Sequence, residues 1–299
     1  MNSPLPEPRL TLLYPENWTD YQLVDSGNGR KLEKYGPYLF IRPEPQAMWT
    51  PELAEKTWKT AHAEFQPSHE ESGGHWLKHK VVNESWIMRF KELSFRAQLT
   101  AGRHLGVFPE QAAHWEWIER VIHRSQRNIQ VLNLFGYTGL ATLAAAQAGA
   151  RVTHVDASKK AVSWARENQS LSGLSDQPVR WIVDDALKFV QREIKRGVAY
   201  DGIILDPPKF GRGPKGEVWE FFDLFPHLLE ACKAILSSKP LFIVITAYAI
   251  RASASSLYYS LQEMTSALGG HITAGELALV EGSAARMIST AIFARWEAD

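Results

Sequence analysis

The residues with the clearest chemical pattern follow an apolar segment in the middle of the chain. Val131-Leu-Asn-Leu-Phe-Gly-Tyr-Thr-Gly139 reads as a strand that runs into a glycine-bearing turn and then a helix. Glycine lets a ligand approach the backbone, and the helix N-terminus behind the turn offers unpaired N–H donors. Asp156 ends the next predicted strand, at a spacing from Gly136 that is typical of a carboxylate bound to ribose hydroxyls. The pattern predicts a nucleoside site.

The composition of the turn indicates which nucleoside it binds. A dinucleotide fingerprint needs Gly-x-Gly-x-x-Gly to seat a pyrophosphate, and Thr138 follows Gly136 where a second glycine would help. A cofactor with adenosine but no phosphates, namely S-adenosylmethionine, fits this turn better. Asp184 and Asp185 end the third predicted strand, where a carboxylate can accept from the adenine amino group. We favour Asp185, which precedes a helix, although a helix N-cap is the alternative role for such an Asp.

A third group of residues closes the fourth predicted strand, Leu205-Asp206-Pro-Pro-Lys-Phe210. Two successive prolines fix φ and remove two N–H donors, so the chain leaves the sheet stiff and extended. This holds Asp206 and the Pro207 carbonyl beside the reactive end of the cofactor. The basic segment 211–216 follows and reads as a lid or a phosphate-contacting loop. The residues predicted to bind substrate are Lys209, Phe210, Arg212, Lys215 and Arg251.

Alternating strands and helices must position these residues. The predicted strands cover 130–134, 151–156, 179–183, 202–206, 240–246, 271–280 and 286–296. The predicted helices cover 109–123, 140–148, 158–171, 186–195, 218–236 and 253–268. Strand–helix alternation gives a parallel sheet covered on both faces, and the last strand must run antiparallel because its connection is too short for a crossover. Ligands bind such a sheet outside the carboxyl ends of its strands.

The first 105 residues have a different texture, with short alternating segments broken by Pro and Gly. The pattern predicts a small β-rich domain, residues 1–105, ahead of a catalytic domain, residues 106–299. Asn83-Glu84 is predicted to turn a hairpin. The strands expected in this domain are 21–24, 38–42, 76–81, 86–90 and 94–99.

Composition excludes several classes of protein. The chain has 299 residues, of which 45% are hydrophobic and 22% charged, so it can bury a full core. Its single cysteine, Cys232, excludes an internal disulfide and any multi-cysteine metal site. The 33 basic and 33 acidic residues give no net charge, so contact with nucleic acid must be local. We expect neither a leader nor a membrane-spanning segment, and we expect a cytoplasmic protein without a metal.

Taken together, the four strand ends resemble the class I S-adenosylmethionine-dependent methyltransferases, over about residues 106–299. Within that class, three motifs look like the bacterial 23S rRNA large-subunit methyltransferases of the cytosine-C5 type. These are 131–139, Val155-Asp-Ala-Ser158 with Ala165 and Asn168, and 206–210. Leu105-Gly-Val-Phe-Pro-Glu-Gln111 is similar to the Gly-x-Phe-x-Asp-Gln segment that this family places before its cofactor domain.

The resemblance implies a Rossmann-like seven-stranded sheet, S-adenosylmethionine as cofactor and RNA as partner. It places Phe135 and Gly136 at the methionine end, Asp156 at the ribose, Asp185 at the adenine and Asp206 at the methyl-transfer edge. The full set expected to bind cofactor is Asn133, Phe135, Gly136, Thr138, Gly139, Asp156, Ala157, Ser158, Asn168, Asp184, Asp185, Ala186 and Asp206. The residues expected at the transfer edge are Asp206, Pro207, Lys209 and Tyr248.

Two departures leave the acceptor atom open. The family attacks pyrimidine C6 with a cysteine that usually follows the fifth strand, where this chain has Thr246-Ala-Tyr248, and Cys232 has the spacing of a core residue. Lys209-Phe210 also lacks the Pro-Pro-aromatic order of enzymes that methylate amino groups of flipped bases. Three alternatives therefore stay open: a protein or small-molecule methyltransferase, an NAD-dependent oxidoreductase, and a non-catalytic module that binds cofactor and RNA.

Overall fold

The computed structural model describes residues 9–68 and 73–299, and the chain divides into two compact units. The larger unit holds the first strand, residues 113–277 and residues 290–299. The smaller unit holds residues 14–112 together with residues 278–289. The two-domain division at residue 105 stays a prediction.

The larger unit is built on an eight-stranded sheet in the order β1-β16-β17-β15-β12-β9-β10-β11. Pairing is parallel between β15, β12, β9, β10 and β11, whereas β17 runs antiparallel to β15. This confirms the predicted α/β fold with a mainly parallel sheet and an antiparallel last strand. The strands are β1 (Leu10–Leu13), β9 (Gln130–Leu134), β10 (Arg151–Asp156), β11 (Val179–Val183), β12 (Gly202–Leu205), β15 (Phe242–Ala247), β16 (His271–Val280) and β17 (Met287–Glu297).

Strand β1 is an eighth member that the sequence did not predict. It pairs in parallel with β16, from Leu10 opposite Ala274 to Leu13 opposite Leu277. Leu10 and Leu12 are exposed, so this strand lacks the alternation of a half-buried strand. Its pairing depends on a partner more than 260 residues away in the chain.

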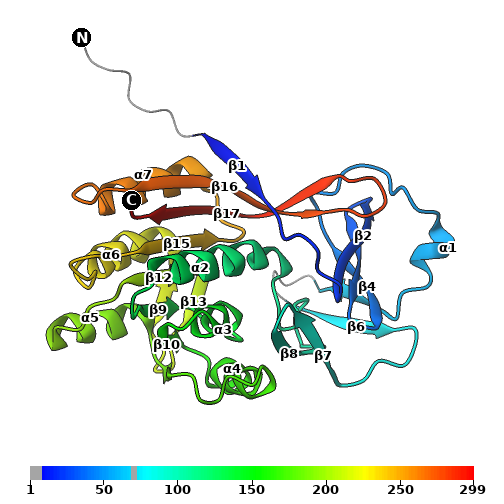
Figure 1. Ribbon diagram of the computed structural model, residues 1–299. Helices are drawn as coiled ribbons and strands as arrows, with labels where there is room; N and C mark the ends of the chain where they lie inside the picture. Colours follow the sequence, from blue (N-terminus) through cyan, green and yellow to red (C-terminus); the bar gives the residue numbers. More distant parts are fainter. Residues whose placement is uncertain (1–8, 69–72) are drawn as a thin grey trace, which may run out of the picture. The chain divides into compact units, whose positions relative to one another are not determined.

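Helices cover both faces of this sheet (Figure 1). On one face, α2 and α3 pack against Val131, Val152 and Val244, with α4 beside β10 and β11. On the other face, α5, α6 and α7 pack against Leu132 and Ile203. The helices are α2 (Ala112–Ser125), α3 (Leu140–Gln147), α4 (Lys159–Leu171), α5 (Ala186–Arg196), α6 (Phe221–Lys233) and α7 (Ala254–Met264), with a short 3-10 turn (Pro109–Gln111) before α2.

The segment after Asp206 differs from the sequence expectation. The predicted loop 211–216 lies within a hairpin of β13 (Phe210–Arg212) and β14 (Val218–Glu220), in which Gly211 pairs with Trp219. The helix predicted from Val218 therefore begins three residues later, at Phe221. The buried Trp219 explains the change, because a strand places it inward beside the Pro208 carbonyl.

The smaller unit contains a five-stranded sheet in the order β2-β3-β4-β5-β6 and a β7-β8 hairpin. The predicted turn at Asn83-Glu84 is wrong, because β6 pairs with β5 and β7 pairs with β8. Two residues, Lys91 and Glu92, connect β7 to β8, and Lys91 takes the positive φ that such a turn needs. The elements are β2 (Tyr21–Gly27), β3 (Arg30–Tyr35), β4 (Tyr38–Pro43), α1 (Glu55–Trp58), β5 (Ala63–Pro67), β6 (Gly74–Lys78), β7 (Ser85–Phe90) and β8 (Leu93–Gln98).

A buried ion pair lies on this smaller sheet. The Arg42 guanidinium donates to Glu33 from Nε at 2.6 Å and from Nη2 at 2.7 Å. Tyr21 donates its hydroxyl to the same carboxylate at 2.8 Å. Both members of the pair are buried, and such a pair is stable only when further hydrogen bonds satisfy it.

Two absences hold for the part of the chain that the structure describes. No helix there is both long and apolar enough to cross a bilayer. No group of three or more His, Cys, Asp or Glu side chains there is arranged to hold a metal ion.

Candidate functional site

The turn after β9 takes an unusual backbone conformation. Phe135 and Tyr137 have positive φ values of 59° and 49°, and Gly139 has a φ of 85°. Non-glycine residues seldom occupy this region, and such outliers cluster at ligand-binding sites. Gly139 is needed twice, because a side chain there would also meet the Cβ of Ala165 at 2.8 Å. The turn thus brings β9 into the N-terminus of α3 with close packing against α4.

Asp156 holds this turn from the neighbouring strand. Its Oδ2 accepts the Tyr137 backbone N–H at 2.9 Å, and its Oδ1 accepts the Ser158 N–H at 2.8 Å. Burial raises the pKa of Asp156, and these two hydrogen bonds act in the opposite direction. A carboxylate has about four acceptor positions, so each oxygen keeps one for a further donor. The two hydroxyls of a ribose match that remaining capacity.

A buried network of polar side chains from β9, α3 and β10 packs against the turn. Thr142 Oγ1 accepts from Asn133 Nδ2 at 2.8 Å and lies 2.9 Å from His154 Nδ1. The His154 ring stacks at a tilt on Trp181, with centroids 4.7 Å apart, and desolvation lowers its pKa to about 3. His154 is therefore neutral. A Cβ on Gly136 would lie 2.5 Å from His154 Nδ1, so only glycine fits here.

Helix α4 supplies two more contacts to the same region. Ser158 caps the helix by accepting the Ala161 N–H at 3.2 Å, and the buried Asn168 donates to the Thr138 carbonyl at 2.9 Å. Ala157 lies between Asp156 and this cap and is half-buried. Asn168 thus fixes the backbone at Thr138, the residue directly before Gly139.

The pair Asp184 and Asp185 lies at the end of β11. Asp184 donates its backbone N–H to the Asp156 carbonyl at 3.1 Å, which places the two residues side by side. Its carboxylate accepts the Asp185 N–H at 2.9 Å and pairs with Arg192. Asp185 caps α5 by accepting the Lys188 N–H at 2.9 Å, and the buried Ala186 begins that helix. The N-cap alternative is thus realised, and it occupies one oxygen of Asp185.

Asp206 follows β12 and lies level with the other strand ends. In the sheet, Leu134 pairs with both Val155 and Leu205, so Asp206 comes directly beside the turn that begins at Phe135. Its backbone N–H donates to the Leu134 carbonyl at 3.4 Å.

The prolines that follow Asp206 are held by the hairpin. Trp219 Nε1 donates to the Pro208 carbonyl at 2.7 Å, and its ring packs edge-on against Phe135, with centroids 4.9 Å apart. The Lys209 carbonyl accepts the Phe221 N–H at 3.1 Å. Pro207 itself is buried, and its carbonyl accepts neither of these two donors.

The predicted substrate residues occupy the hairpin and the segment after β15. The Phe210 side chain is 51% exposed, and the side chains of Lys209, Arg212 and Lys215 are also exposed. Arg251 is exposed as well and forms no ion pair within residues 9–68 and 73–299. Tyr248, expected at the transfer edge, is partly buried and packs against an apolar cluster of Leu277, Ala291 and Phe293.

The structure therefore joins most of the predicted cofactor residues into one connected site. Hydrogen bonds link the turn to Asp156 and Asn168. Asp184 bonds in turn to Asp156, and Asp206 bonds to the end of β9. Sequence reasoning missed Thr142, His154 and Trp219, which position the turn. One signal could have revealed His154, because it is an ionisable residue in the interior of the predicted parallel strand Arg151–Asp156.

Comparison with known proteins decides which cofactor the site serves. Residues 52–237, more than half of the chain, match the profile of a family described as S-adenosylmethionine-dependent methyltransferase. The chain belongs to that methyltransferase family. Membership in this family confirms the predicted cofactor, S-adenosylmethionine. It argues against the alternative of an NAD-dependent oxidoreductase. The residues at the turn fit this cofactor, because Asp156 keeps acceptor capacity for a ribose while the turn lacks the glycines that seat a pyrophosphate.

Several proteins resemble this methyltransferase. A crystal structure of a SAM-dependent methyltransferase from Agrobacterium tumefaciens is 47% identical, with a TM-score of 0.92 over 97% of this chain and 94% of that one. A structure of a SAM-dependent methyltransferase from Streptococcus mutans is 18% identical, with a TM-score of 0.68 over 93% and 75% of the two chains. That second likeness shows the fold alone.

The curated relatives of this methyltransferase carry a more specific name. The ribosomal RNA large subunit methyltransferase K/L of Shewanella sp. strain MR-4 is 33% identical over 125 residues, which are 41% of this chain and 17% of that protein. A relative of the same name from Shewanella baltica strain OS155 is 32% identical over 147 residues, or 48% and 20% of the two proteins. The methyltransferase thus matches no more than about a fifth of the length of these relatives.

Proposed function

We propose that this methyltransferase acts on RNA, and that ribosomal RNA is its substrate. The observation that carries the proposal is its similarity to relatives named as ribosomal RNA large subunit methyltransferases. The hairpin directly after Asp206 supports it, because this hairpin exposes an aromatic ring, Phe210, beside Lys209 and Arg212. Bases stack on exposed aromatic rings, and cationic side chains contact the phosphates. A ribosomal substrate would place the enzyme in the cytoplasm.

We assign the cofactor residues by the groups that they can reach. S-adenosylmethionine supplies a methyl group already activated by its sulfonium. Asp156 accepts the two ribose hydroxyls with the oxygen positions that Tyr137 and Ser158 leave free. Asp185, with Asp184 beside it, accepts the adenine amino group, while Phe135 and Gly136 line the methionine end. The site thus binds and orients the cofactor largely through backbone groups and carboxylates.

The transfer edge lies at Asp206 and the prolines after it. The chain aligns the acceptor behind the methyl group and excludes water, which is the main contribution expected for a displacement at an activated carbon. Asp206 orients the acceptor or takes its proton, and the Pro207 carbonyl accepts a hydrogen bond from it. Lys209 steadies a phosphate. Tyr248 packs against Phe293 and its neighbours, so its part in this edge is to fix the end of β15.

A cysteine nucleophile has no place in this mechanism. Cys232 lies in α6 with no exposed surface, and burial raises the pKa of its thiol well above the ordinary value. A thiol held neutral inside a helix cannot attack a pyrimidine ring. We therefore propose direct transfer to the acceptor, without a covalent enzyme–base intermediate.

Transfer of a radiolabelled methyl group tests the RNA proposal. The acceptors would be ribosomal subunits, total RNA and total protein from a strain that lacks the gene, each incubated with the wild-type enzyme and with Asp206→Asn. We expect label in ribosomal RNA with the wild-type enzyme and a loss of about 100-fold or more with the variant. Label in protein alone, or in small molecules alone, would refute an RNA substrate while leaving the methyltransferase activity intact.

A further inference from the structure

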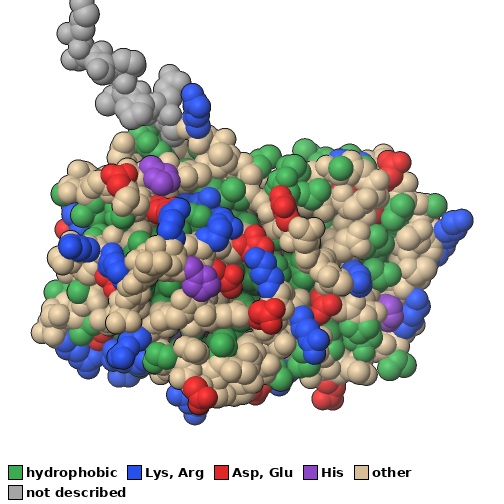
Figure 2. Space-filling model, in the orientation of Figure 1, with side chains coloured by type: hydrophobic (Ala, Val, Ile, Leu, Met, Phe, Trp, Pro, Cys, Tyr) green, Lys and Arg blue, Asp and Glu red, His purple; other side chains and the backbone are tan. Residues whose placement is uncertain are grey.

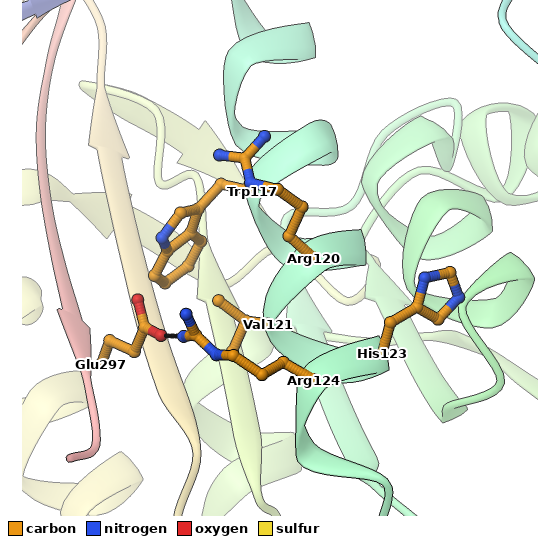
Figure 3. Close-up of a pocket in the computed structure, with 6 residues that line it drawn as sticks. All are labelled: Trp117, Arg120, Val121, His123, Arg124 and Glu297. Carbon is orange, nitrogen blue, oxygen red and sulfur yellow. Dashed lines mark ion pairs between the residues drawn. The ribbon is translucent and has the colours of Figure 1, made fainter.

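A cavity in the larger unit lies at the opposite edge of the sheet from the predicted cofactor residues. Glu297, at the end of β17, pairs with Phe242 at the start of β15, so this region adjoins the amino ends of the parallel strands. The cavity has a volume of about 510 Å³ (Figure 3). Its walls come from α2 and β17, through Trp117, Arg120, Val121, His123, Arg124 and Glu297.

The charged side chains around this cavity play different parts. Arg124 forms an ion pair with Glu297 across the opening, and His123 points away from Trp117 and Glu297 (Figure 3). Arg120 is exposed, extends beside Trp117, and has no carboxylate partner within the described residues. The cavity therefore presents one exposed guanidinium, that of Arg120, for which no ion pair is found in the described ranges.

A second guanidinium lies close behind the cavity wall. Arg295, on β17, places its Cζ 4.7 Å from the centroid of the Trp117 ring. Burial, together with repulsion from the nearby Arg120, lowers the pKa of Arg295 to about 10. No carboxylate in the described ranges pairs with Arg295 either. Two like charges held together in this way favour an anion between or beside them.

Helix geometry does not explain this arrangement. Basic residues in a last helical turn complement the negative end of the helix dipole, and this accounts for His123 and Arg124 at the end of α2. Arg120 lies one turn earlier, and Arg295 belongs to a strand. Several Lys and Arg side chains lie on the face over α2 (Figure 2), although the chain as a whole carries no net charge. The helix dipole therefore explains neither Arg120 nor Arg295.

We propose that the cavity beside Trp117 binds a phosphate group, and that Arg120 and Arg295 supply the charge that holds it. Guanidinium groups match phosphate in both charge and hydrogen-bond geometry. Trp117 is only 6% exposed and is covered by Arg295, so it offers no free ring face to a nucleobase. The site therefore binds the phosphate without reading a base.

The position of a second arginine-lined cavity indicates that the phosphate belongs to an RNA strand. A cavity of about 280 Å³ lies at the starts of β9, β10 and β11 and includes Arg151 and Arg180. Four strand-to-strand steps separate β17 from β10, which is about 19 Å at the usual spacing. A single small ligand cannot span both cavities, but the backbone of a polynucleotide can. This part of the inference rests on the proposed RNA substrate.

Binding of a fluorescently labelled single-stranded RNA tests the inference. We would compare the wild-type enzyme with Arg120→Gln and Arg151→Gln, using Arg166→Gln on α4 as a control because Arg166 is also exposed. Arg120→Gln and Arg151→Gln should each bind RNA at least about threefold more weakly than the wild-type enzyme. Each of these two substitutions should also reduce the magnitude of the slope of log affinity against log salt concentration by about 0.7, the value for one phosphate contact on a single strand. Arg166→Gln should bind RNA as the wild-type enzyme does. Every variant should keep the wild-type affinity for S-adenosylmethionine.

A second measurement separates the two sources of phosphate and keeps the two proposals apart. If the cavity takes a free phosphate, added inorganic phosphate or AMP should raise the Tm of the wild-type enzyme in thermal unfolding. The same ligand should raise the Tm of Arg120→Gln by less. Unchanged RNA affinity in Arg120→Gln, with no effect of phosphate or AMP, would overturn the inference even if the wild-type enzyme methylates RNA. Conversely, phosphate binding that depends on Arg120 would support the cavity even if RNA were not the substrate.

Discussion

The carboxylate of Asp156 accepts the backbone N–H of Tyr137 at 2.9 Å, which ties the end of β10 to the turn after β9. The same carboxylate also accepts the Ser158 N–H, so it shapes two segments around the proposed ribose position. Because each oxygen retains an acceptor position, Asp156 can build the turn and bind the cofactor at once. Its replacement should therefore affect both.

Asp156→Asn is expected to weaken cofactor binding by tenfold or more. The amide keeps the shape of the side chain, but its NH2 group cannot accept from Tyr137, Ser158 or a ribose hydroxyl. Loss of hydrogen bonds to a charged acceptor costs about 1.5–3 kcal/mol. Titration calorimetry with S-adenosylmethionine measures the change directly.

Asp176→Asn provides the matched control, because Asp176 is exposed and lies in the turn before β11. This variant should bind the cofactor as the wild type does. Equal affinity of Asp156→Asn and the wild type would remove Asp156 from the ribose position. Thermal unfolding of both variants shows whether any loss of binding comes from a less stable fold.

Gly136→Ala should destabilise the turn and reduce cofactor binding. The new methyl group would overlap the ring of His154, which is fully buried and cannot move away freely. Overpacking of this kind costs about 1–3 kcal/mol. Urea unfolding and cofactor titration give the two effects.

A double variant shows whether the clash is the cause. Gly136→Ala combined with His154→Ala should recover part of the stability that Gly136→Ala loses, relative to His154→Ala alone. Gly102→Ala serves as a control, because the nearest atom to its new Cβ would be 3.8 Å away. A purely additive double variant would show that His154 is not what excludes a side chain at position 136.

Cys232→Ala should retain methyl transfer at close to the wild-type rate. The thiol is buried in α6 at the centre of an apolar cluster, so its removal leaves a small cavity and costs about 1 kcal/mol of stability. Single-turnover transfer and urea unfolding separate the two quantities. Abolished transfer in a folded Cys232→Ala enzyme would restore a covalent mechanism.

The ion pair of Glu33 and Arg42 should make stability depend on pH in the acid range. Burial alone would raise the pKa of Glu33. The charges of Arg42 and Lys31 outweigh this effect and lower the pKa from 4.5 to about 2. A depressed pKa means that the stabilisation is complete above the unfolded-state value and is lost as the pH falls from about 5 to 2. The shift corresponds to at most about 3 kcal/mol. Urea unfolding across this range measures it.

Glu33→Gln isolates this contribution. The variant leaves the Arg42 charge buried without its carboxylate partner, so it should lose about 3–5 kcal/mol at neutral pH. Its stability should fall less steeply than that of the wild type between pH 5 and 2. Glu92→Gln, in the exposed β7-β8 turn, should follow the wild-type curve. Parallel curves for Glu33→Gln and the wild type would contradict the assigned pKa.

The sequence by itself determined the central sheet and the order of the residues at its carboxyl edge. Strands β9, β10 and β11 have the predicted bounds, because each is a short run of strand-forming residues that a turn or a helix cap ends. The same local signals placed Gly136, Asp156 and Asp206 at strand ends. In a parallel sheet those ends meet at one edge, so strand periodicity predicted that these three residues would lie close together, while their roles toward the cofactor stay a proposal.

Only the tertiary structure decided which distant segments lie together. The pairing of β1 with β16, the His154–Thr142–Asn133 network and the approach of Arg295 to Arg120 join residues that no local pattern connects. Even the 213–217 segment became a hairpin turn because Trp219 is buried against Phe135. The physical reason is that local periodicity specifies an element, whereas its partners are selected by burial and by hydrogen bonds across the whole fold.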